Sequence, residues 1–570
     1  MLIHVVNLMY VVNKNVWVVI RMDKFTKAAI MFSAIVAFGG FVFGLDAALI
    51  SGTTGYLTSE FGLDDLQLGN VVSAPALGVL LALVVTGAIC ESIGRKKTLI
   101  LIAALYIVSA VTSVIAPSYE ALVAARFLGG LAFASLSMAS MYIGEIAPAK
   151  QRGKLVSTNQ IMIVVGLTTA YFANYFLVGL TTNDPEFAKE IGLLGNEWRW
   201  MLGVEVIPAV LWGILLLTVP ESPRWLISKG RIEEAKQALS RLMAPEKIDA
   251  EVEEVRNNLK ADGGESLSII DQLKILGEPK FRLAIMVGVI FAAVQPLTGV
   301  NPILFYAPMV FEQTGIGANA AYAQTLIIGV VSFIFTVLAI VFVDKIGRRP
   351  LVNFGLAASV ACLLMCVIAF QQATYTLDAQ DIATLVAANS SLSADSLQTV
   401  IGVTYSDDTQ FKTALAGIIG AQEFKAVENQ FIQAAVSINA TLVLVGIVGF
   451  IAAFHISIGP IMWVVFSEIV PTQIRGVAIP LFALISSTIS YFMQKFFPWM
   501  LNQMGGADVF MSFVIAGGIG FILLYRYLPE TKGRTIEEIE HMMAGKHKDG
   551  EPKKSASLIT DDEEQRKATS

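Results

Sequence analysis

The chain has 570 residues, of which 55% are hydrophobic and only 15% are charged, and its mean hydropathy is +0.66. Soluble domains use about 45 to 50% apolar and about 25% charged residues, so this composition excludes an ordinary soluble protein. It predicts a protein that crosses the lipid bilayer many times. The net charge is −6, and nothing in it indicates nucleic acid as a partner.

The N-terminal residues 1–28 form a predicted extension before the first span. Their apolar run is interrupted by Asn13, Lys14 and Asn15, so they match neither a signal peptide nor a full span. We expect either that Met22 is the working start or that the extension lies on the inner membrane surface.

Twelve segments are long and apolar enough to span a membrane, which takes about 20 apolar residues. They lie near 29–51, 69–90, 98–116, 121–144, 156–178, 199–219, 284–311, 322–343, 350–370, 434–466, 477–499 and 508–527. The predicted fold is therefore an all-α polytopic membrane protein. Its parts are a six-helix bundle (29–220), a helical linker (221–280), a second six-helix bundle (281–542) with an insertion at 372–433, and a charged, disordered tail (543–570).

Basic residues cluster in alternate loops, which predicts the orientation. The clusters lie at 95–97, 150–154, 224–241, 345–349, 475 and 532–534, all on one side if twelve helices alternate. Short loops rich in Lys and Arg stay in the cytoplasm. We therefore expect a multi-pass protein of the cell (inner) membrane with a cytoplasmic linker and both termini inside.

The three cysteines, Cys90, Cys362 and Cys366, all lie in apolar segments. No His or carboxylate stands beside Cys362 and Cys366 to complete a metal site. We expect small buried hydrophobes rather than a disulfide framework, and no metal or cofactor.

One carboxylate, Asp46, interrupts the first apolar segment. An ionisable group at membrane depth costs about 2.5 to 3.5 kcal/mol on insertion scales, and it normally marks an ion or proton path with a charged partner. At about 1.5 Å per residue, Asp46 lies in the outer third of the first span, Arg126 roughly 8 Å into the fourth and Glu205 about 9 Å into the sixth. Three helices thus place two acids and a guanidinium at similar depth.

The two predicted bundles repeat one pattern. Glu145-Ile146-Ala147-Pro148 with Arg152-Gly153 recurs as Glu468-Ile469-Val470-Pro471 with Arg475-Gly476 at identical spacing. Gly94-Arg95-Lys96 recurs as Gly347-Arg348-Arg349, and Pro220-Glu221-Ser222 as Pro529-Glu530-Thr531. Parallel repeats with a site between them near the midplane are typical of transporters that work by alternating access.

These motifs identify a family. With Arg126-Phe127-Leu128-Gly129-Gly130 and Pro223-Arg224-Trp225-Leu226, they make the chain resemble the sugar porter family of the major facilitator superfamily from about Phe38 to Ile539. The insertion at 372–433 lies outside this resemblance. Family members that couple to protons carry an Asp at the position of Asp46, and facilitators generally lack it. The resemblance therefore implies that Asp46, Arg126 and Glu205 couple transport to a proton, with a static buried salt bridge as the alternative.

The resemblance also implies a substrate site. Amide side chains both donate and accept, as sugar hydroxyls do, and an aromatic surface suits the apolar face of a sugar. The positions that match the family's contacts, on both bundles, are Phe43, Gln160, Gln295, Asn301, Phe305, Ser332 and Trp463.

Several positions in and beside this predicted site depart from the family pattern. Pro296 replaces a second Gln, Phe305 replaces a Tyr before Tyr306, and Ser486 and Ser487 stand where a Gln and a Trp occur in a relative. Because unpaired polar groups discriminate strongly between ligands, ordinary glucose or xylose is in doubt as the substrate. Pro296, Gly299 and Pro302 also predict a broken seventh helix.

The repeated charges predict a cytoplasmic gate made of Glu91, Arg95, Glu145, Arg152, Arg348, Glu468 and Arg475. We expect Arg95 and Arg348 to pair with the other charges only when the two halves approach. In the family such pairs lock the inner gate while the protein faces outward. The alternative is that these residues only determine topology.

Our interpretation is a proton-coupled symporter that imports a monosaccharide or related polyol and acts as a monomer. A facilitative uniporter with a structural Asp46 is the nearer alternative, and a non-transporting nutrient sensor on the same fold is another. An enzyme is not expected, since no nucleophile and base are paired in the sequence.

Overall fold

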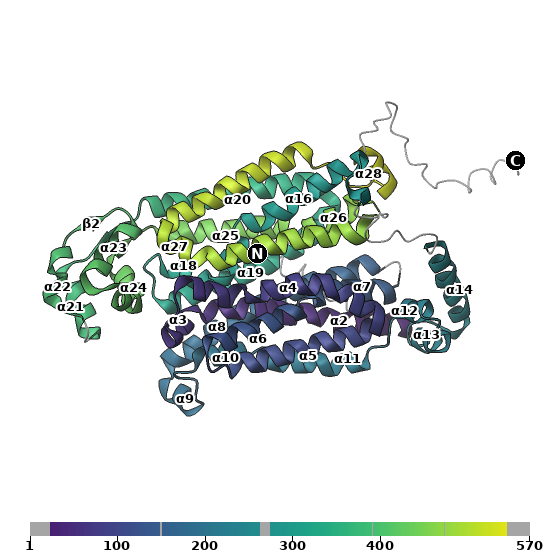
Figure 1. Cartoon of the computed structure of the whole chain (residues 1–570), viewed down its shortest axis with the longest axis horizontal. Coiled ribbons are helices and arrows are strands. Elements are labelled where there is room, and N and C mark those ends of the chain that lie inside the picture. The colour runs from purple at the N-terminus through teal and green to yellow at the C-terminus, as the bar shows by residue number, and fades with distance from the viewer. Residues whose placement is uncertain (1–22, 149–150, 263–273, 390–391, 472–473, 544–570) are drawn as a thin grey trace, which may run out of the picture.

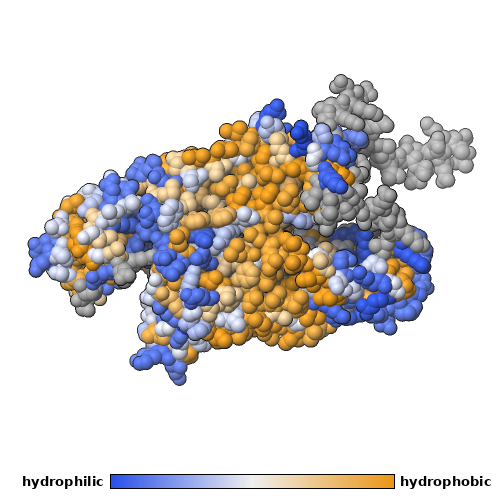
Figure 2. All heavy atoms as spheres, viewed as in Figure 1, coloured by the Kyte–Doolittle hydropathy of each residue, from blue (hydrophilic) through white to orange (hydrophobic). Residues whose placement is uncertain are grey.

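The computed structural model describes residues 23–148, 151–262, 274–389, 392–471 and 474–543. Within them the helices form two bundles that lie side by side, one built from the first part of the chain and one from the second (Figure 1). On the face shown in Figure 2, an apolar belt crosses the middle of the molecule and hydrophilic residues gather at its two ends. This is the surface that a lipid bilayer requires of a spanning protein.

The first half contains six spans. They are α2 (Lys24–Leu49), α4 (Asp65–Ile93), α5 (Arg95–Val114), α6 (Tyr119–Ala132) with α7 (Ser135–Ile146), α8 (Arg152–Asn183), and α10 (Glu197–Gly203) with α11 (Val206–Thr218). Short elements connect them: η1 (Ile50–Gly52), α3 (Thr54–Phe61) and α9 (Pro185–Glu190). Local signals set their ends, as where Asp64 and Gln67 form a capping box that begins α4.

The second half repeats this arrangement. Its elements are η2 (Pro279–Phe281), α16 (Arg282–Leu297), α17 (Val300–Phe305), α18 (Ala307–Glu312), α19 (Ala318–Ile346), α20 (Arg348–Gln371), α25 (Ala440–Ile456), α26 (Ile458–Ile469) and α27 (Arg475–Tyr527). Eleven helical segments of the described chain are long and apolar enough to span a membrane. The last has 53 residues and holds two spans, because Gly505 with φ 78° interrupts it. The twelve-helix fold is confirmed.

The seventh span is broken, as the sequence predicted. Gly299 has φ 83° and separates α16 from α17, a conformation that glycine adopts without steric cost. The two prolines, Pro296 and Pro302, lie within the flanking helices. The fourth, sixth and tenth spans are also interrupted, at Phe133–Ala134, Val204–Glu205 and Ser457, which the sequence did not predict.

The insertion is a small folded unit beside one end of the second half. Its sheet has the order β2-β1-β3, and β1 (Thr374–Thr376) pairs antiparallel with both β2 (Thr404–Tyr405) and β3 (Val436–Ser437). Its helices are α21 (Ala379–Ala388), α22 (Ala394–Leu397), η3 (Gln398–Val400), α23 (Asp408–Ile419) and α24 (Ala421–Ala435). They enclose a core of their own around Tyr375, Leu397, Phe411 and Phe431.

The predicted start of the tenth span at 434 is wrong. Residues 436–437 form strand β3, because their partner β1 is available in the insertion, and α25 begins only at Ala440. Asn439 caps this helix by accepting a hydrogen bond from the Leu442 backbone. The folded insertion thus extends a few residues beyond 433.

The linker helices lie at the opposite end of the molecule (Figure 1). They are α12 (Pro223–Ser228), α13 (Ile232–Leu239) and α14 (Pro245–Asp262), and α28 (Ile536–Met543) lies at this end too. We call this end the linker end and the other the insertion end. The predicted extension and tail fall almost wholly outside the described residues.

Candidate functional site

Asp46 is held by close packing between α2 and α8. A Cβ atom on Gly44 would lie 1.9 Å from the Ile163 carbonyl oxygen, and one on Gly166 would lie 2.0 Å from that of Phe41. The two backbones therefore touch where only glycine fits. This contact fixes α2 near the insertion end, where Asp46 is 1% exposed.

Arg126 of α6 is the partner of Asp46. Its Nη1 donates to Asp46 Oδ1, and both side chains are buried. The other carboxylate oxygen, Oδ2, and the guanidinium Nε are buried without a hydrogen-bond partner among the described residues. The ion pair is thus only partly satisfied, although most buried side-chain polar atoms have at least one hydrogen-bond partner.

Glu205 completes the group. It directly precedes α11, at the interruption of the sixth span, and it is 4% exposed. It lies close enough to interact electrostatically with both Asp46 and Arg126. The structure thus brings these three side chains close together, while their coupling role stays a prediction.

Tyr106 is a neighbour that sequence reasoning missed. This α5 residue is fully buried, hydrogen-bonds through its hydroxyl to Ser135 Oγ at 3.3 Å and interacts electrostatically with Asp46 and Glu205. A tyrosine inside an apolar run carries no signal that distinguishes it from ordinary core packing.

Two predicted substrate residues meet α27. Gln295 Oε1 accepts a hydrogen bond from Ser486 Oγ at 3.4 Å, and Asn301 Nδ2 donates to Ser490 Oγ at 2.5 Å. Gln494 Nε2 also donates to Ser490, at 2.7 Å. The seventh and eleventh spans thus share a polar contact. Two of its residues, Ser490 and Gln494, were not predicted from the sequence.

The remaining predicted substrate residues lie apart from that contact. Phe43 packs edge-on against Phe133 at 4.5 Å between ring centroids, and Trp463 packs edge-on against Phe466 at 5.7 Å. Each contact is within one half. Of the other three positions, Gln160 and Phe305 are half-buried and Ser332 is fully buried. The Ser332 hydroxyl has no hydrogen-bond partner among the described residues.

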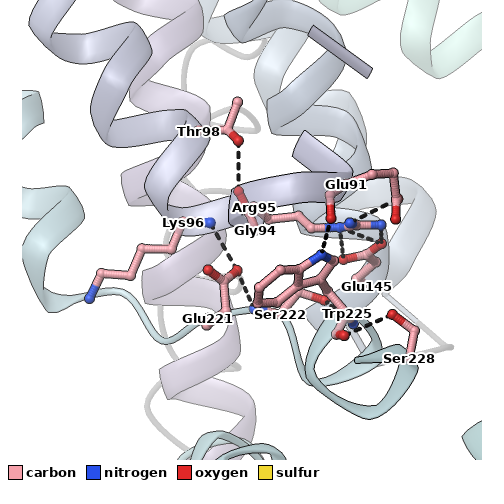
Figure 3. A network of polar contacts seen from close by, with 10 residues as sticks. All are labelled: Glu91, Gly94, Arg95, Lys96, Thr98, Glu145, Glu221, Ser222, Trp225 and Ser228. Carbon is pink, nitrogen blue, oxygen red and sulfur yellow. Dashed lines mark hydrogen bonds and ion pairs between the residues drawn. The ribbon is translucent and has the colours of Figure 1, made fainter. Parts of the chain in front are cut away.

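A network of charged and polar side chains lies at the linker end of the first half (Figure 3). Arg95 contacts Glu91 at 3.0 Å and Glu145 at 3.1 Å. Glu221 accepts hydrogen bonds from the Lys96 and Ser222 backbones at 2.9 Å.

The second half repeats this network. Arg348 contacts Glu468 at 2.9 Å and Asp344 at 3.0 Å. Glu530 accepts from the Arg348 and Arg349 backbones at 3.1 Å, so the internal repeat extends to hydrogen bonds.

The expectation that these charges pair only when the two halves approach is wrong. Each cluster is complete within one half, because Gly94 with φ 98° and Gly347 with φ 105° turn the chain so that the arginine that follows starts a helix beside its own half's glutamate. Arg152 is exposed without an ion pair among the described residues. Arg475 donates instead to the carbonyl oxygens of Ser467 and Val470.

The two halves are joined from the middle of the bundle to the insertion end. The hydrogen bonds between their described residues are Tyr322 to the Gly52 carbonyl (2.5 Å), Tyr171 to that of Leu304 (2.8 Å), Thr168 to that of Gly329 (2.9 Å), Asn502 to Asp65 (2.8 Å) and Asn319 to Thr182 (3.3 Å). The structure is therefore closed at the insertion end.

Comparison with solved structures gives the same architecture. The xylose transporter of Escherichia coli in a partially occluded inward-open conformation superposes with a TM-score of 0.67 at 26% identity, covering 89% of this chain and all of the other. Twelve spans in two repeated halves define a multi-pass membrane transporter of the major facilitator type.

The sequence places the chain within that class. It matches the family described as Sugar (and other) transporter over residues 32–390 and 397–543. It is 30% identical to the arabinose-proton symporter of Bacillus subtilis (90% of this chain, 94% of the relative) and 30% identical to the D-xylose-proton symporter of Escherichia coli K12 (89% and 94%). The chain belongs to the Sugar (and other) transporter family.

Proposed function

We propose that the protein is a proton-coupled symporter that imports a monosaccharide or a related polyol by alternating access. It acts as a monomer in the inner membrane, with the linker end and both termini in the cytoplasm. Two relatives that match nearly the whole chain are named proton symporters for pentoses. The basic clusters at the linker end support the orientation.

The observation that carries this proposal is the buried pair of Asp46 and Arg126 beside Glu205. Arginine stays protonated in proteins, so the proton that moves must bind a carboxylate. Protonation of Asp46 removes its charge and releases Arg126, which can then pair with Glu205. This exchange of partners changes the contacts between α2, α6 and α11. The bound proton can therefore shift the equilibrium between two conformations, because it makes different contacts in each.

Sugar binding is assigned to the polar contact between the seventh and eleventh spans. Gln295 and Asn301 each face a serine there, and both amides can donate and accept. The break at Gly299 lies between them. A sugar bound here contacts both parts of the broken seventh span. Its contacts can therefore favour opening of the transporter at one end or the other.

The test is uptake into proteoliposomes with and without an imposed pH gradient, over hexoses, pentoses and inositols. Asp46→Asn is expected to abolish accumulation against a gradient while leaving substrate exchange. Glu120→Gln is the matched control, because Glu120 is an exposed acid on the helix that carries Arg126. Concentrative uptake by the Asp46→Asn protein would overturn the coupling role.

The same assay separates the alternatives. A wild-type protein that equilibrates sugar and ignores the pH gradient is a uniporter with a structural Asp46. A protein that binds sugar without any flux is a sensor. An enzymatic role has no support from the family to which the chain belongs.

A further inference from the structure

A polar stripe runs along the eleventh span, in the part of α27 before Gly505. Spacings of one and four residues put its six members on one face of the helix, over a length of about 13 Å. They are Ser486, Ser487, Ser490, Tyr491, Gln494 and Lys495. Outside the stripe, Phe492 and Trp499 are 51% and 42% exposed, as lipid contact requires.

Two serines in the first part of the stripe already form hydrogen bonds. Ser486 contacts Gln295, and Ser490 contacts Asn301 and Gln494. These are the residues to which we assign the sugar. The stripe therefore leads from the proposed sugar site toward the insertion end, and it ends at Lys495.

Among the described residues, Lys495 has aromatic neighbours and no ion-pair partner. Its Nζ lies 3.4 Å from the Tyr491 hydroxyl and over the rings of Tyr491 and Phe496, at 5.7 and 5.8 Å from their centroids. No carboxylate of the described chain lies within ion-pair distance of it. The residue is 20 positions after Arg475, or about 30 Å along the helix. Because the hydrocarbon core is about 30 Å thick, Lys495 lies near the edge of the core at the insertion end, where its half-buried side chain is within reach of an anion that enters from that end.

Lys495 also lies where the two halves meet. A Cβ atom on Gly69 of α4 would lie 1.9 Å from the Lys495 carbonyl oxygen, so the two backbones are in contact. Separation of the halves at the insertion end must open this contact. The lysine then stands beside the path from the insertion end to Asn301.

We propose that Lys495 binds a carboxylate of the transported solute, so that the substrate class is an acidic sugar, a uronate or an aldonate, rather than a neutral one. This inference rests on the proposed sugar-proton symport and deepens it. Lysine binds a carboxylate by a charge-assisted hydrogen bond, and these are about twice as strong as neutral ones. One anionic sugar carried with one proton moves no net charge, whereas a neutral sugar with a proton moves one.

The test uses proteoliposomes of the full chain with an inward proton gradient. Glucuronate, galacturonate and gluconate are compared with glucose and galactose, and each uptake is measured with and without a membrane potential. We expect the acids to be taken up in preference, at a rate independent of the potential. Lys495→Gln is expected to weaken uptake of the acids by about tenfold, the loss of one charged hydrogen bond. Lys495→Arg is expected to retain most of it.

Lys189→Gln is the matched control, because it removes an exposed lysine from the insertion end. If Lys495 instead binds a lipid phosphate, Lys495→Gln reduces the uptake of acidic and neutral sugars equally. The reduction then depends on the fraction of anionic lipid in the vesicles. That result overturns the inference. So does proton-driven uptake of neutral sugars that acidic sugars do not inhibit, and this outcome leaves the proposed symport intact.

Discussion

At the scale of single residues, Asp46 and Arg126 form a buried charge pair. Both side chains are buried, and each keeps one polar atom without a partner among the described residues. Breaking a buried pair by removing one member is costly, because the remaining charge is left without compensation.

Arg126→Leu is therefore expected to lower the free energy of unfolding by about 3 to 5 kcal/mol. Adding Asp46→Asn should recover much of this loss, because the orphaned charge disappears. Thermal unfolding of the purified protein in detergent measures both variants. Equal destabilisation of the single and double variants would contradict the assignment of an ion pair.

Glu312 is a second carboxyl group with few partners, outside the spans. Asn429 of the insertion donates to its Oε2 at 3.2 Å, and Tyr56 and Tyr322 lie close enough to interact with it. Burial raises the pKa of Glu312 from 4.5 to about 7. A raised carboxyl pKa means that the folded state binds more protons than the unfolded state.

Stability is therefore expected to fall as the pH rises from about 4.5 to about 7, because the buried carboxylate must ionise within that window. Glu312→Gln should flatten this dependence and keep the hydrogen bond to Asn429. Melting temperatures across the window test it, with the exposed Glu186→Gln as the control. An unchanged slope in Glu312→Gln would assign the dependence to other groups.

At the scale of elements, the interruptions of the helices decide where side chains meet. The seventh span was predicted to break because glycine and proline mark the place. The fourth is interrupted at Phe133–Ala134, shortly after Gly129 and Gly130. Adjacent glycines weaken a helix locally, but they did not distinguish an interrupted span from a continuous one in the sequence.

Gly299→Ala tests the break in the seventh span. Its φ of 83° is unfavourable for alanine, and a Cβ would lie 2.3 Å from the Phe513 ring. We expect a loss of about 1 to 3 kcal/mol in stability, together with slower transport. Gly87→Ala is the control, since a Cβ there meets no atom within 4 Å and alanine favours the helix. Matching effects of the two substitutions in unfolding and uptake assays would remove the special role of Gly299.

At the scale of the whole molecule, alternating access requires that the insertion end, which is closed in this structure, opens in another state. Thr182 and Asn319, from opposite halves, lie within 3.3 Å at that end. Cysteines at both positions, joined by a short thiol-reactive linker, should stop transport by holding this end closed. Either single cysteine treated with the same reagent should transport normally, since the native cysteines are buried or half-buried. Full uptake by the cross-linked protein would show that this end need not open.

The sequence by itself determined the spans, their repeat and the depth of Asp46, Arg126 and Glu205. Hydropathy and charge belong to each segment, and a helix converts residue number directly into depth. The triad was therefore predictable before any packing was known, and so was the family.

Only the tertiary structure decided which charges are partners. The repeated motif places Glu145 and Arg95 at neighbouring helix ends but is silent on whether they pair within one half or between two. The turn at Gly94 settles this, because it directs Arg95 onto the end of α7 in its own half. Likewise, the fold of the insertion and the contacts of Lys495 depend on residues far apart in the chain. Their positions follow from packing between elements, which no local pattern encodes.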